Sequence, residues 1–416
     1  MINRPLKLAL VTRRYPPLIG GAEKVLSYLA EALAAEGADV TVVTSMVPGL
    51  ELAAREEVPV KVTDTDIDEH AGQVARGRLT VVRLETARLR FWGTWRYMRN
   101  LNRWFRENPI DLAYVSMLKH DAYVVIGAGR RLGFPVVLRP EGAGATGDVA
   151  WQSWGNFGRR IGLRCRRTDA FVAISPSIEQ ELRAAWRSGT IRPSRWREWF
   201  HRTPETPPIV AISNGVPIPE TAWQRRPEWR AAPRAVFVGR LAPEKGLDTL
   251  IDAWPSVRVR YPQARLILIG EGPQRTALQD RVKALGLTLG PGQAVELPGA
   301  SADATDALRG ADLFVLPSRE EGMSIALLEA MALGVPLVAS SIPGNRRLVG
   351  DFKHGRLAPP DDPEALARAI IEQWDDFDRA VHMSRVARSR VEQEFSIQTM
   401  ARQHLELFQE KVVIIH

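Results

Sequence analysis

Two successive series of short apolar segments, each alternating with helical patterns, constrain the fold of this chain more than any other feature. The first series opens with an apolar run at 8–12, a loop rich in proline and glycine at 16–21, a helical pattern that ends at Gly37, and a second apolar run at 39–44. Segments that are apolar throughout are typical of parallel strands covered by helices on both faces. The sequence therefore predicts an α/β protein.

The same alternation continues through the rest of the chain. Further strands are expected at 79–84, 112–115, 136–138, 170–174, 209–212, 235–238, 265–269, 294–297, 313–316 and 337–339. A proline-rich stretch without a core-forming pattern separates the two series and is typical of a linker. We therefore predict a first domain at 1–216, a linker at 217–233, a second domain at 234–390, and a C-terminal helix at 391–416 that crosses back to the first domain. Two doubly wound, Rossmann-like domains facing a central cleft are the expected architecture.

Composition excludes several classes of protein. Of the 416 residues, 45% are hydrophobic and 25% are charged, which is not the balance of a disordered chain. No run of about 18 apolar residues occurs, so no membrane-spanning helix is expected. The first ten residues resemble a strand rather than a signal peptide, because Lys7 interrupts the apolar stretch. The single cysteine, Cys165, excludes a disulfide within the chain and fits a cytoplasmic protein.

Charge is distributed unevenly along the chain. Residues 1–230 carry 34 Lys and Arg against 24 Asp and Glu, a net charge of +10, whereas residues 231–416 carry 22 against 24, a net charge of −2. Ten of the twelve tryptophans also precede residue 231. A basic, tryptophan-rich first half and a nearly neutral second half suggest two domains with different partners.

Two cations follow the expected strand at 235–238. Arg240 and Lys245 lie five residues apart in a loop that begins at Gly239 and ends at Gly246. Ligands of open α/β sheets bind at the carboxyl ends of strands, where a guanidinium and an ammonium can hold a diphosphate together. An ordinary solvated loop is the alternative interpretation.

A second segment, after the strand at 313–316, favours an anion site at the start of a helix. The helix is expected to end near Leu333, because Gly334 and Pro336 follow. Backbone amides at 322–324 would then face a ligand. Glu321 stands at the mouth of this helix and Glu329 about 12 Å further along its axis, both able to face one side. Ribose or sugar hydroxyls, or an arginine of the protein itself, are candidate partners for Glu329.

These segments belong to an ordered set of short motifs. The set comprises Gly20-Gly21-Ala22-Glu23, Ile212-Ser213-Asn214-Gly215-Val216, Val238-Gly239-Arg240-Leu241, Lys245-Gly246, Gly270-Glu271-Gly272-Pro273, Glu321-Gly322, Leu328-Glu329-Ala330-Met331-Ala332 and Gly334-Val335-Pro336. The set resembles that of the retaining family-4 glycosyltransferases (glycosyl transferases group 1), which have the GT-B fold. The resemblance is dense from about 235 to 350 and sparse from 45 to 170.

The resemblance implies a role for each matching residue. Arg240 and Lys245 would hold the donor diphosphate, in a loop that begins at Gly239. Glu321 would contact the donor sugar, and Glu329 would hydrogen-bond the nucleotide ribose.

Further donor contacts are implied on both sides of the linker. The backbone amides of Gly322, Met323, Ser324 and Ile325 would assist Glu321 in binding the sugar. Gly20 and Gly21 would let the first loop approach the phosphates, and His120 stands where the family often has a histidine that reaches the sugar. A simple loop histidine is the alternative. Met323 and Ser324 replace the aromatic residue and the glycine that are usual after Glu-Gly, so the sugar pocket is expected to differ in shape.

The function that follows from the resemblance is a hexosyltransferase that moves a sugar from a nucleotide-diphosphate donor to an acceptor hydroxyl with retention. The acceptor is expected to be a glycan precursor, a lipid-linked molecule or a small molecule, and the donor base stays open between UDP, GDP and ADP. A GT-B epimerase or phosphorylase, or a catalytically silent GT-B scaffold, is the alternative. No metal or other cofactor is expected, because the sequence has no His-x-x-x-His pair or paired Cys/His cluster.

Two other patterns receive a structural interpretation. Gly270 and Gly272 lack the third glycine of a dinucleotide fingerprint and predict a turn between a strand and a helix. The segment 88–106 contains six arginines and no acid, with Arg96, Arg99, Arg103 and Arg106 on one side of a helical wheel. Such a helix can lie on anionic lipid at the periphery of a membrane, or it can pack its apolar side on its own domain. Further arginines occur at 159–167 and 186–202, but no motif predicts nucleic-acid binding.

Overall fold

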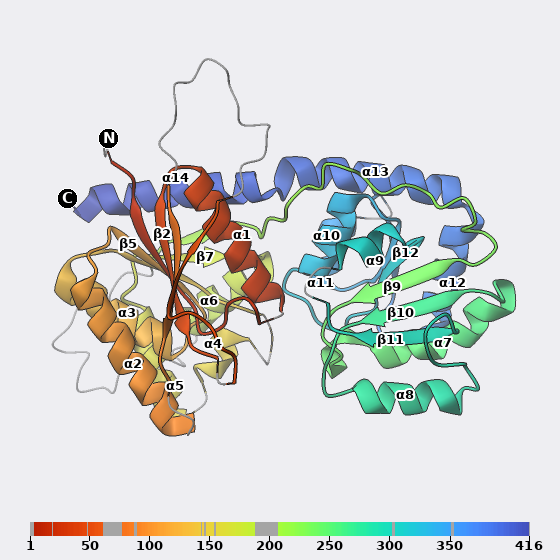
Figure 1. The fold of residues 1–416 in the computed structure, drawn as a ribbon, viewed down its shortest axis with the longest axis horizontal. Coiled ribbons are helices and arrows are strands. Elements are labelled where there is room, and N and C mark those ends of the chain that lie inside the picture. The colour runs from red at the N-terminus through yellow and green to blue at the C-terminus, as the bar shows by residue number, and fades with distance from the viewer. Residues whose placement is uncertain are drawn as a thin grey trace, which may run out of the picture. The chain divides into compact units, whose positions relative to one another are not determined.

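The computed structural model describes residues 4–18, 20–47, 49–60, 77–86, 90–142, 144, 147–153, 155–187, 207–301, 304–350 and 353–415. The chain divides into two units. Unit 1 contains Met1–Leu18, Ala22–Ser213 and Ile397–His416, and unit 2 contains Ile19–Gly21 and Asn214–Ser396. Both units are α/β structures with a largely parallel sheet, so the predicted fold class is confirmed (Figure 1).

Unit 1 is built on an eight-stranded sheet with the order β3-β4-β2-β1-β5-β6-β7-β8. Its strands are β1 (Lys7–Val11), β2 (Asp39–Ser45), β3 (Arg55–Val58), β4 (Leu79–Leu84), β5 (Leu112–Ser116), β6 (Val136–Arg139), β7 (Ala170–Ala173) and β8 (Ile209–Ala211). Its helices are α1 (Gly21–Ala35), α2 (Arg90–Glu107), α3 (His120–Leu132), α4 (Asp148–Trp151), α5 (Gly155–Cys165), α6 (Pro176–Arg187) and α14 (Ile397–Ile415). Only the edge strand β3, among the described strands of this sheet, is antiparallel.

Alternating strand residues build a separate core on each face of this sheet. Ala113 and Val115 of β5 point into a core that also contains residues of α2, α3, α5 and α6. Tyr114, between them, points to the opposite face, because successive strand residues alternate. There its hydroxyl lies 3.0 Å from Nε2 of His404, on α14. The last helix therefore completes the core of unit 1.

His404 is held as a neutral ring in this core. Its Nδ1 lies 2.8 Å from the carbonyl oxygen of Met400, so Nδ1 carries the proton and Nε2 accepts from Tyr114. Burial lowers the pKa of His404 to about 4, because a charged imidazole would lose its hydration there.

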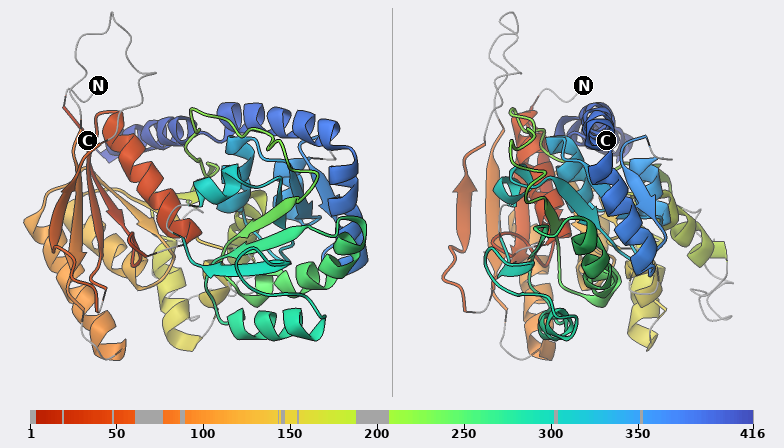
Figure 2. Two further views of the ribbon diagram at one scale, coloured as in Figure 1. Left: turned by 45° about the vertical axis from the view of Figure 1, so that its right-hand side comes forward. Right: turned by 90° about the vertical axis from the view of Figure 1, so that its right-hand side faces the viewer.

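Unit 2 is built on a six-stranded parallel sheet with the order β11-β10-β9-β12-β13-β14. Its strands are β9 (Arg234–Val238), β10 (Arg265–Ile269), β11 (Val295–Gly299), β12 (Leu313–Leu316), β13 (Leu337–Ser340) and β14 (Arg356–Ala358). Its helices are α7 (Leu247–Arg260), α8 (Arg275–Ala284), α9 (Thr305–Arg309), α10 (Ile325–Leu333), α11 (Pro343–Val349), α12 (Pro363–Asp375) and α13 (Phe377–Glu394), with a 3₁₀ turn at Pro243–Lys245. Each sheet lies between helices (Figure 2).

The proline-rich stretch 217–233 contains no helix or strand, but it packs closely on unit 2. The indole nitrogen of Trp223 donates to the carbonyl of Ala311 over 2.7 Å. Arg226 forms an ion pair with the buried Asp312, and the ring of Trp229 stacks on Phe377 with 3.8 Å between centroids. Buried aromatic side chains thus fix the course of this stretch.

Helix α2 packs its apolar side on its own domain, which is the second of the two alternatives that its pattern allowed. Its residues Tyr97, Leu101 and Phe105 are buried in the core of unit 1, so the apolar side of the helix is not available to a membrane. Trp92 and Trp95 remain exposed instead, at 56% and 50%. The expected segment begins at residue 88, and 88–89 lie outside the described residues, as do 188–202 of the third basic cluster.

Candidate active site

The strand order of each sheet reverses at one point, where open α/β sheets bind their ligands. In unit 2 the reversal lies between β9 and β12, and in unit 1 between β1 and β5. The loops after β9 and β12 carry Arg240, Lys245 and Glu321. The loops after β1 and β5 carry Gly20 and lead to His120. The predicted residues therefore fall at the switch points of their own sheets.

In unit 2 the structure brings together Lys245 and Glu321. The Nζ of Lys245 donates to Oε1 of Glu321 over 2.5 Å, and the hydroxyl of Ser318 donates to the same oxygen over 2.8 Å. Both charged side chains are largely buried, with 20% and 10% exposed. An ammonium has three donors, so Lys245 keeps two for a ligand oxygen.

A buried network of hydrogen bonds holds Ser318, the residue that bonds Glu321. Ser318, which bonds Glu321, accepts through its carbonyl a hydrogen bond from the hydroxyl of Ser340. The amide of Asn345 in turn donates to the carbonyl and hydroxyl oxygens of Ser340, over 3.0 and 3.1 Å. Gly344 lies so close that a Cβ would stand 2.5 Å from the carbonyl of Glu321. This packing fixes the backbone on which Glu321 stands.

The other predicted cation, Arg240, is exposed and its side chain makes no ion pair with a described residue. Its loop is nevertheless ordered by the turn after β10. Leu241 donates to the carbonyl of Glu271 over 3.0 Å, and Gln274 donates to the carbonyl of Leu241 over 3.0 Å. A Cβ on Gly272 would stand 2.3 Å from that carbonyl, which explains the glycine. Gly270 and Gly272 thus form a turn between strand and helix, as predicted.

Helix α10 begins later than a continuous helix from Glu321 would require. Its first residue is Ile325, and the hydroxyl of its N-cap, Ser324, accepts from the amide of Leu327 over 3.3 Å. Glu321 lies in the preceding loop, so the 12 Å spacing calculated along one helix to Glu329 does not apply. The N-cap role also explains why a serine replaces the usual glycine.

The loop before α10 presents backbone donors. The amides of Gly322, Met323, Ser324 and Ile325 donate to no described residue. Met323 is buried, so it shapes the loop rather than lining an open surface. Glu329 lies in the second turn of α10 and is partly exposed. As predicted, the helix ends at Gly334, whose φ is 85°.

In unit 1 His120 is the first residue of α3 and is half-buried. Its ring centroid lies 5.9 Å from that of Trp151 and 5.1 Å from that of Phe157. Burial lowers the pKa of His120, and the positive charges of Arg13 and Lys119 lower it further. The imidazole is therefore neutral at pH 7.

A buried ionic cluster, which the sequence analysis missed, surrounds His120. Arg13 Nε lies 3.6 Å from Oδ1 of Asp121, and its guanidinium stands 4.7 Å from the ring centroid of Tyr97. Burial raises the pKa of Asp121 to about 6. Arg13 comes two residues after the end of β1, as Arg240 does after β9, so the rule that identified Arg240 could have identified it. Gly20 precedes α1 and Gly21 begins it, and neither has a positive φ.

The predicted basic residues of α2 differ in their surroundings. Arg96 forms a 2.5 Å ion pair with Glu85. The guanidinium of Arg99 stands 5.6 Å from the ring of Trp95. Arg103 and Arg106 are exposed.

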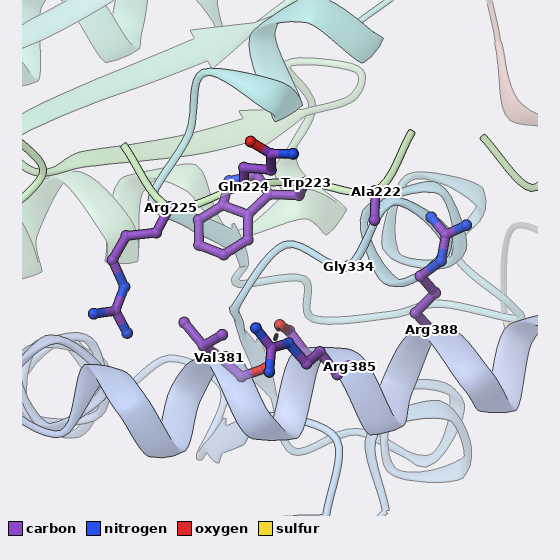
Figure 3. A pocket seen from close by; sticks show the side chains of 9 residues that line it. Ala222, Trp223, Gln224, Arg225, Gly334, Val381, Arg385 and Arg388 are labelled. Atoms are coloured by element: carbon purple, nitrogen blue, oxygen red, sulfur yellow. Dashed lines mark hydrogen bonds between the residues drawn. The ribbon is translucent and has the colours of Figure 1, made fainter. Parts of the chain in front are cut away.

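A pocket of about 260 Å³ lies at the other end of α10, between Trp223 and α13 (Figure 3). Arg388 closes one side of it and donates to the carbonyls of Ala332 and Pro219 over 2.9 and 2.8 Å. None of the predicted site residues lines this pocket. Among the described residues, no group of three or more His, Cys, Asp or Glu side chains is placed to hold a metal ion. Nor does the described part of the chain contain a helix that could cross a membrane.

Two family models match the chain. The model described as Glycosyltransferase Family 4 matches residues 19–201, and the model described as Glycosyl transferases group 1 matches residues 232–376. A glycogen synthase of Mycobacterium tuberculosis is 27% identical over 418 residues, covering 95% of this chain and 92% of that protein. A GDP-mannose-dependent phosphatidylinositol monomannoside mannosyltransferase of the same species is 33% identical over 47% of this chain and 52% of that protein.

Solved structures share the fold. Sucrose-phosphate synthase from Thermosynechococcus elongatus superimposes with a TM-score of 0.75 at 21% identity, covering 99% of this chain and all of that one. Anabaena HepE in complex with UDP-glucose superimposes with a TM-score of 0.70 at 20% identity, over 97% of this chain and all of that one. The chain is thus an enzyme of the family-4 glycosyltransferases, with the GT-B fold.

Proposed function

We propose that this enzyme transfers a hexosyl group from a nucleotide-diphosphate sugar to an acceptor hydroxyl with retention of configuration. The observation that carries the proposal is the pairing of Lys245 with Glu321 at the switch point of unit 2. Beside this pair, the amides of 322–325 donate to no described residue. This arrangement offers cationic and N–H donors to a diphosphate and a carboxylate to sugar hydroxyls. HepE, a structural relative, binds UDP-glucose.

In the proposed reaction the bond between the anomeric carbon and the diphosphate oxygen breaks, and the diphosphate keeps the electron pair. The acceptor oxygen forms the new bond on the same face, and its proton passes to the leaving diphosphate oxygen. Arg240, Lys245 and the amides stabilise the negative charge that grows on the leaving group. Glu321 orients the sugar and Glu329 the ribose, while neutral His120 offers a hydrogen bond to the sugar.

We propose that no metal ion is needed, because these groups balance the charge of the leaving diphosphate. The test incubates the protein with UDP-, GDP- and ADP-sugars and measures nucleotide release and the anomer of the product, with and without EDTA. Retained configuration and EDTA-insensitive release are expected for one donor base. A scaffold would release no nucleotide from any donor. An epimerase would alter the sugar without transfer to an acceptor.

We further propose that the enzyme works at the cytoplasmic face of a membrane, on a lipid-linked acceptor. The support is α2, which carries the exposed Trp92 and Trp95, Arg99 over the ring of Trp95, and the exposed Arg103 and Arg106 further along the helix. Tryptophan is favoured at the interface of a bilayer, and each basic residue near anionic lipid contributes about 1 kcal/mol. These exposed side chains of α2 would therefore make the contact with lipid, since the apolar side of the helix is buried.

Vesicle co-sedimentation tests the membrane proposal. Binding is expected for anionic but not neutral vesicles and should weaken at 1 M salt, where the screening length is about 3 Å. Changing Arg96, Arg99, Arg103 and Arg106 to Gln should reduce it more than tenfold. The same charge is removed in a control with Gln at the exposed Arg230, Arg260, Arg309 and Arg379 of unit 2. Equal loss in both variants, or equal binding to both vesicles, would favour a soluble acceptor.

A further inference from the structure

Arg319 lies two residues before Glu321, and each of its three side-chain nitrogens donates to a protein acceptor. Its Nη2 donates to both carboxylate oxygens of Asp248, over 2.9 and 2.8 Å. Its Nε donates to Oδ1 of Asp361 over 2.6 Å, and its Nη1 to the carbonyl of Pro243 over 2.6 Å. Most of its hydrogen-bonding capacity is therefore directed at these partners, which are the natural route for a role of this side chain.

The partners of Arg319 come from three separate segments. Pro243 begins the 3₁₀ turn that ends at Lys245, Asp248 lies in the first turn of α7, and Asp361 precedes α12. The backbone amide of Arg319 adds a bond of 2.8 Å to the carbonyl of Glu244, the middle residue of the 3₁₀ turn. The loop after β12 is therefore fastened to the loop after β9 at two consecutive carbonyls.

Charge reinforces these bonds of Arg319 to Pro243, Asp248 and Asp361, which we call the clamp. Burial alone would raise the pKa of Asp248, but the hydrogen bond and the charge of Arg319 lower it overall. The bonds to Asp248 and Asp361 raise the pKa of Arg319. Both directions indicate that the ionised forms are stabilised by each other.

The backbone around Lys245 leaves little freedom once the clamp is formed. Gly246, the next residue, has a φ of 60°, and a Cβ there would stand 2.3 Å from the carbonyl of Pro317, in the loop of Arg319. Asp361 also has a positive φ, of 58°, which is costly for a residue with a side chain. The unfavourable conformation places its carboxylate on Arg319.

We infer that Arg319, with Asp248 and Asp361, is a positioning residue that fixes the 2.5 Å approach of Lys245 to Glu321 and aims Lys245 at the donor diphosphate. Lysine is a point charge on a flexible four-carbon stem, so its aim depends on the backbone that carries it. The inference rests on the proposed function of Lys245. A misplacement of about 1 Å in such a group can lower the rate about 10²-fold.

The experiment compares Arg319→Gln with Arg281→Gln. Arg281 makes a similar two-point ion pair, with Asp252, between α7 and α8, and these hydrogen bonds reach neither site loop. Asp248 and Arg319 act on Arg281 through their charges alone. Arg319→Gln should lower kcat about 10- to 100-fold at saturating donor. Arg281→Gln should keep the wild-type kcat even if it unfolds at a lower temperature. Arg319→Lys should recover only part of the activity, because an ammonium cannot reach all three partners at once.

A double-mutant cycle separates positioning from a merely structural role. If Arg319 acts through Lys245, Arg319→Gln should change kcat less than about threefold in a Lys245→Ala background. Additive effects, or a loss that Arg281→Gln reproduces, would overturn the positioning role. Normal turnover by Lys245→Ala would instead overturn the proposed function itself. Full activity of Arg319→Gln beside an inactive Lys245→Ala would overturn only the inference.

Discussion

The charged side chains at the switch points of the two sheets differ in how they are paired. In unit 2 Glu321 accepts two hydrogen bonds, and the loops around it are fastened by Arg319. In unit 1 Arg13 and Asp121 face each other at 3.6 Å without a hydrogen bond. Several buried atoms there, the hydroxyl of Tyr97 and Oδ1 of Asp121 among them, have no hydrogen-bond partner among the described residues.

The difference lies in the carboxylates of the two switch points, since Oε1 of Glu321 accepts two hydrogen bonds and Oδ1 of Asp121 accepts none from a described residue. A buried polar atom without a partner costs about 1–3 kcal/mol, so unit 1 retains unfavourable free energy at its switch point. In unit 2 the ion pair of Lys245 and Glu321 is hydrogen-bonded, and the amides of 322–325 donate to no described residue. The network beside Glu321 also has a buried atom of the same kind, because Oδ1 of Asn345 has no hydrogen-bond partner among the described residues. We therefore expect the proposed donor activation to be preorganised in unit 2, whereas the charged groups of unit 1 would gain more from a bound ligand.

The largest effect on the rate of transfer is expected from removing Lys245 or Arg240, the two cations at the switch point of unit 2. Lys245→Ala or Arg240→Ala should lower the rate of transfer about 10²–10³-fold, because each removes a charged donor to the leaving group. Steady-state kinetics and thermal unfolding of the same preparations give the measurement. His120→Ala in unit 1 is expected to cost less. If the unit 1 variant lost more activity than either cation variant, the assignment of donor activation to unit 2 would be wrong.

The second effect concerns stability and belongs to unit 1. In the unfolded chain His404 gains a proton as the pH falls below about 6.5, whereas the folded pKa is about 4. The free energy of unfolding should therefore fall by about 3 kcal/mol between pH 6.5 and 4 through this group. His404→Gln cannot titrate, so the stability difference between wild type and variant should shrink as the pH falls. Denaturant unfolding across this range measures it, with His382→Gln on α13 as the matched substitution. A constant difference would contradict the neutral, buried imidazole.

A smaller effect is expected at Glu329. Glu329→Gln keeps the shape of the side chain but removes the charged acceptor of the proposed ribose contact. We expect about tenfold weaker binding of the nucleotide diphosphate by calorimetric titration. Glu320→Gln makes the same change at an exposed neighbouring position. Equal affinities of both variants and wild type would leave Glu329 with a structural role only.

The smallest effect is expected at the far end of α10. Gly334 has a φ of 85°, but a Cβ there would meet nothing closer than 3.7 Å. Gly334→Ala should therefore cost only the conformational penalty of about 1–2 kcal/mol in stability and leave kcat unchanged. Gly246→Ala, which would clash with the carbonyl of Pro317, should affect both stability and kcat. Equal behaviour of the two variants would show that the clamp near Lys245 is not what makes unit 2 rigid.

Much of the fold was predictable because buried parallel strands have a strong apolar signal. The expected strand at 79–84 is β4 to the residue, whereas β3 and β14 were missed. β3 consists of Arg55-Glu56-Glu57-Val58 at an edge, where one strand partner suffices and apolar residues are not required. The structure brings Lys245 and Glu321 together, but the bonds of Arg319 join residues 42 to 76 apart in the sequence, a pairing without local signal. Burial of the apolar side of α2 was one of two predicted alternatives, and the pattern could not choose between them, because it fits both lipid and core.

The return of α14 to unit 1 has a consequence for the order of folding. The hydrogen bond between Tyr114 and His404 joins residues 290 apart, and all of unit 2 from Asn214 to Ser396 lies between them. During synthesis the ribosome must therefore deliver the whole of unit 2 before one face of the sheet in unit 1 can be covered. Domains fold as units while the chain emerges, so unit 2 can reach its native state first. Until residue 404 arrives, the apolar surface around Tyr114 is left to water or to a chaperone.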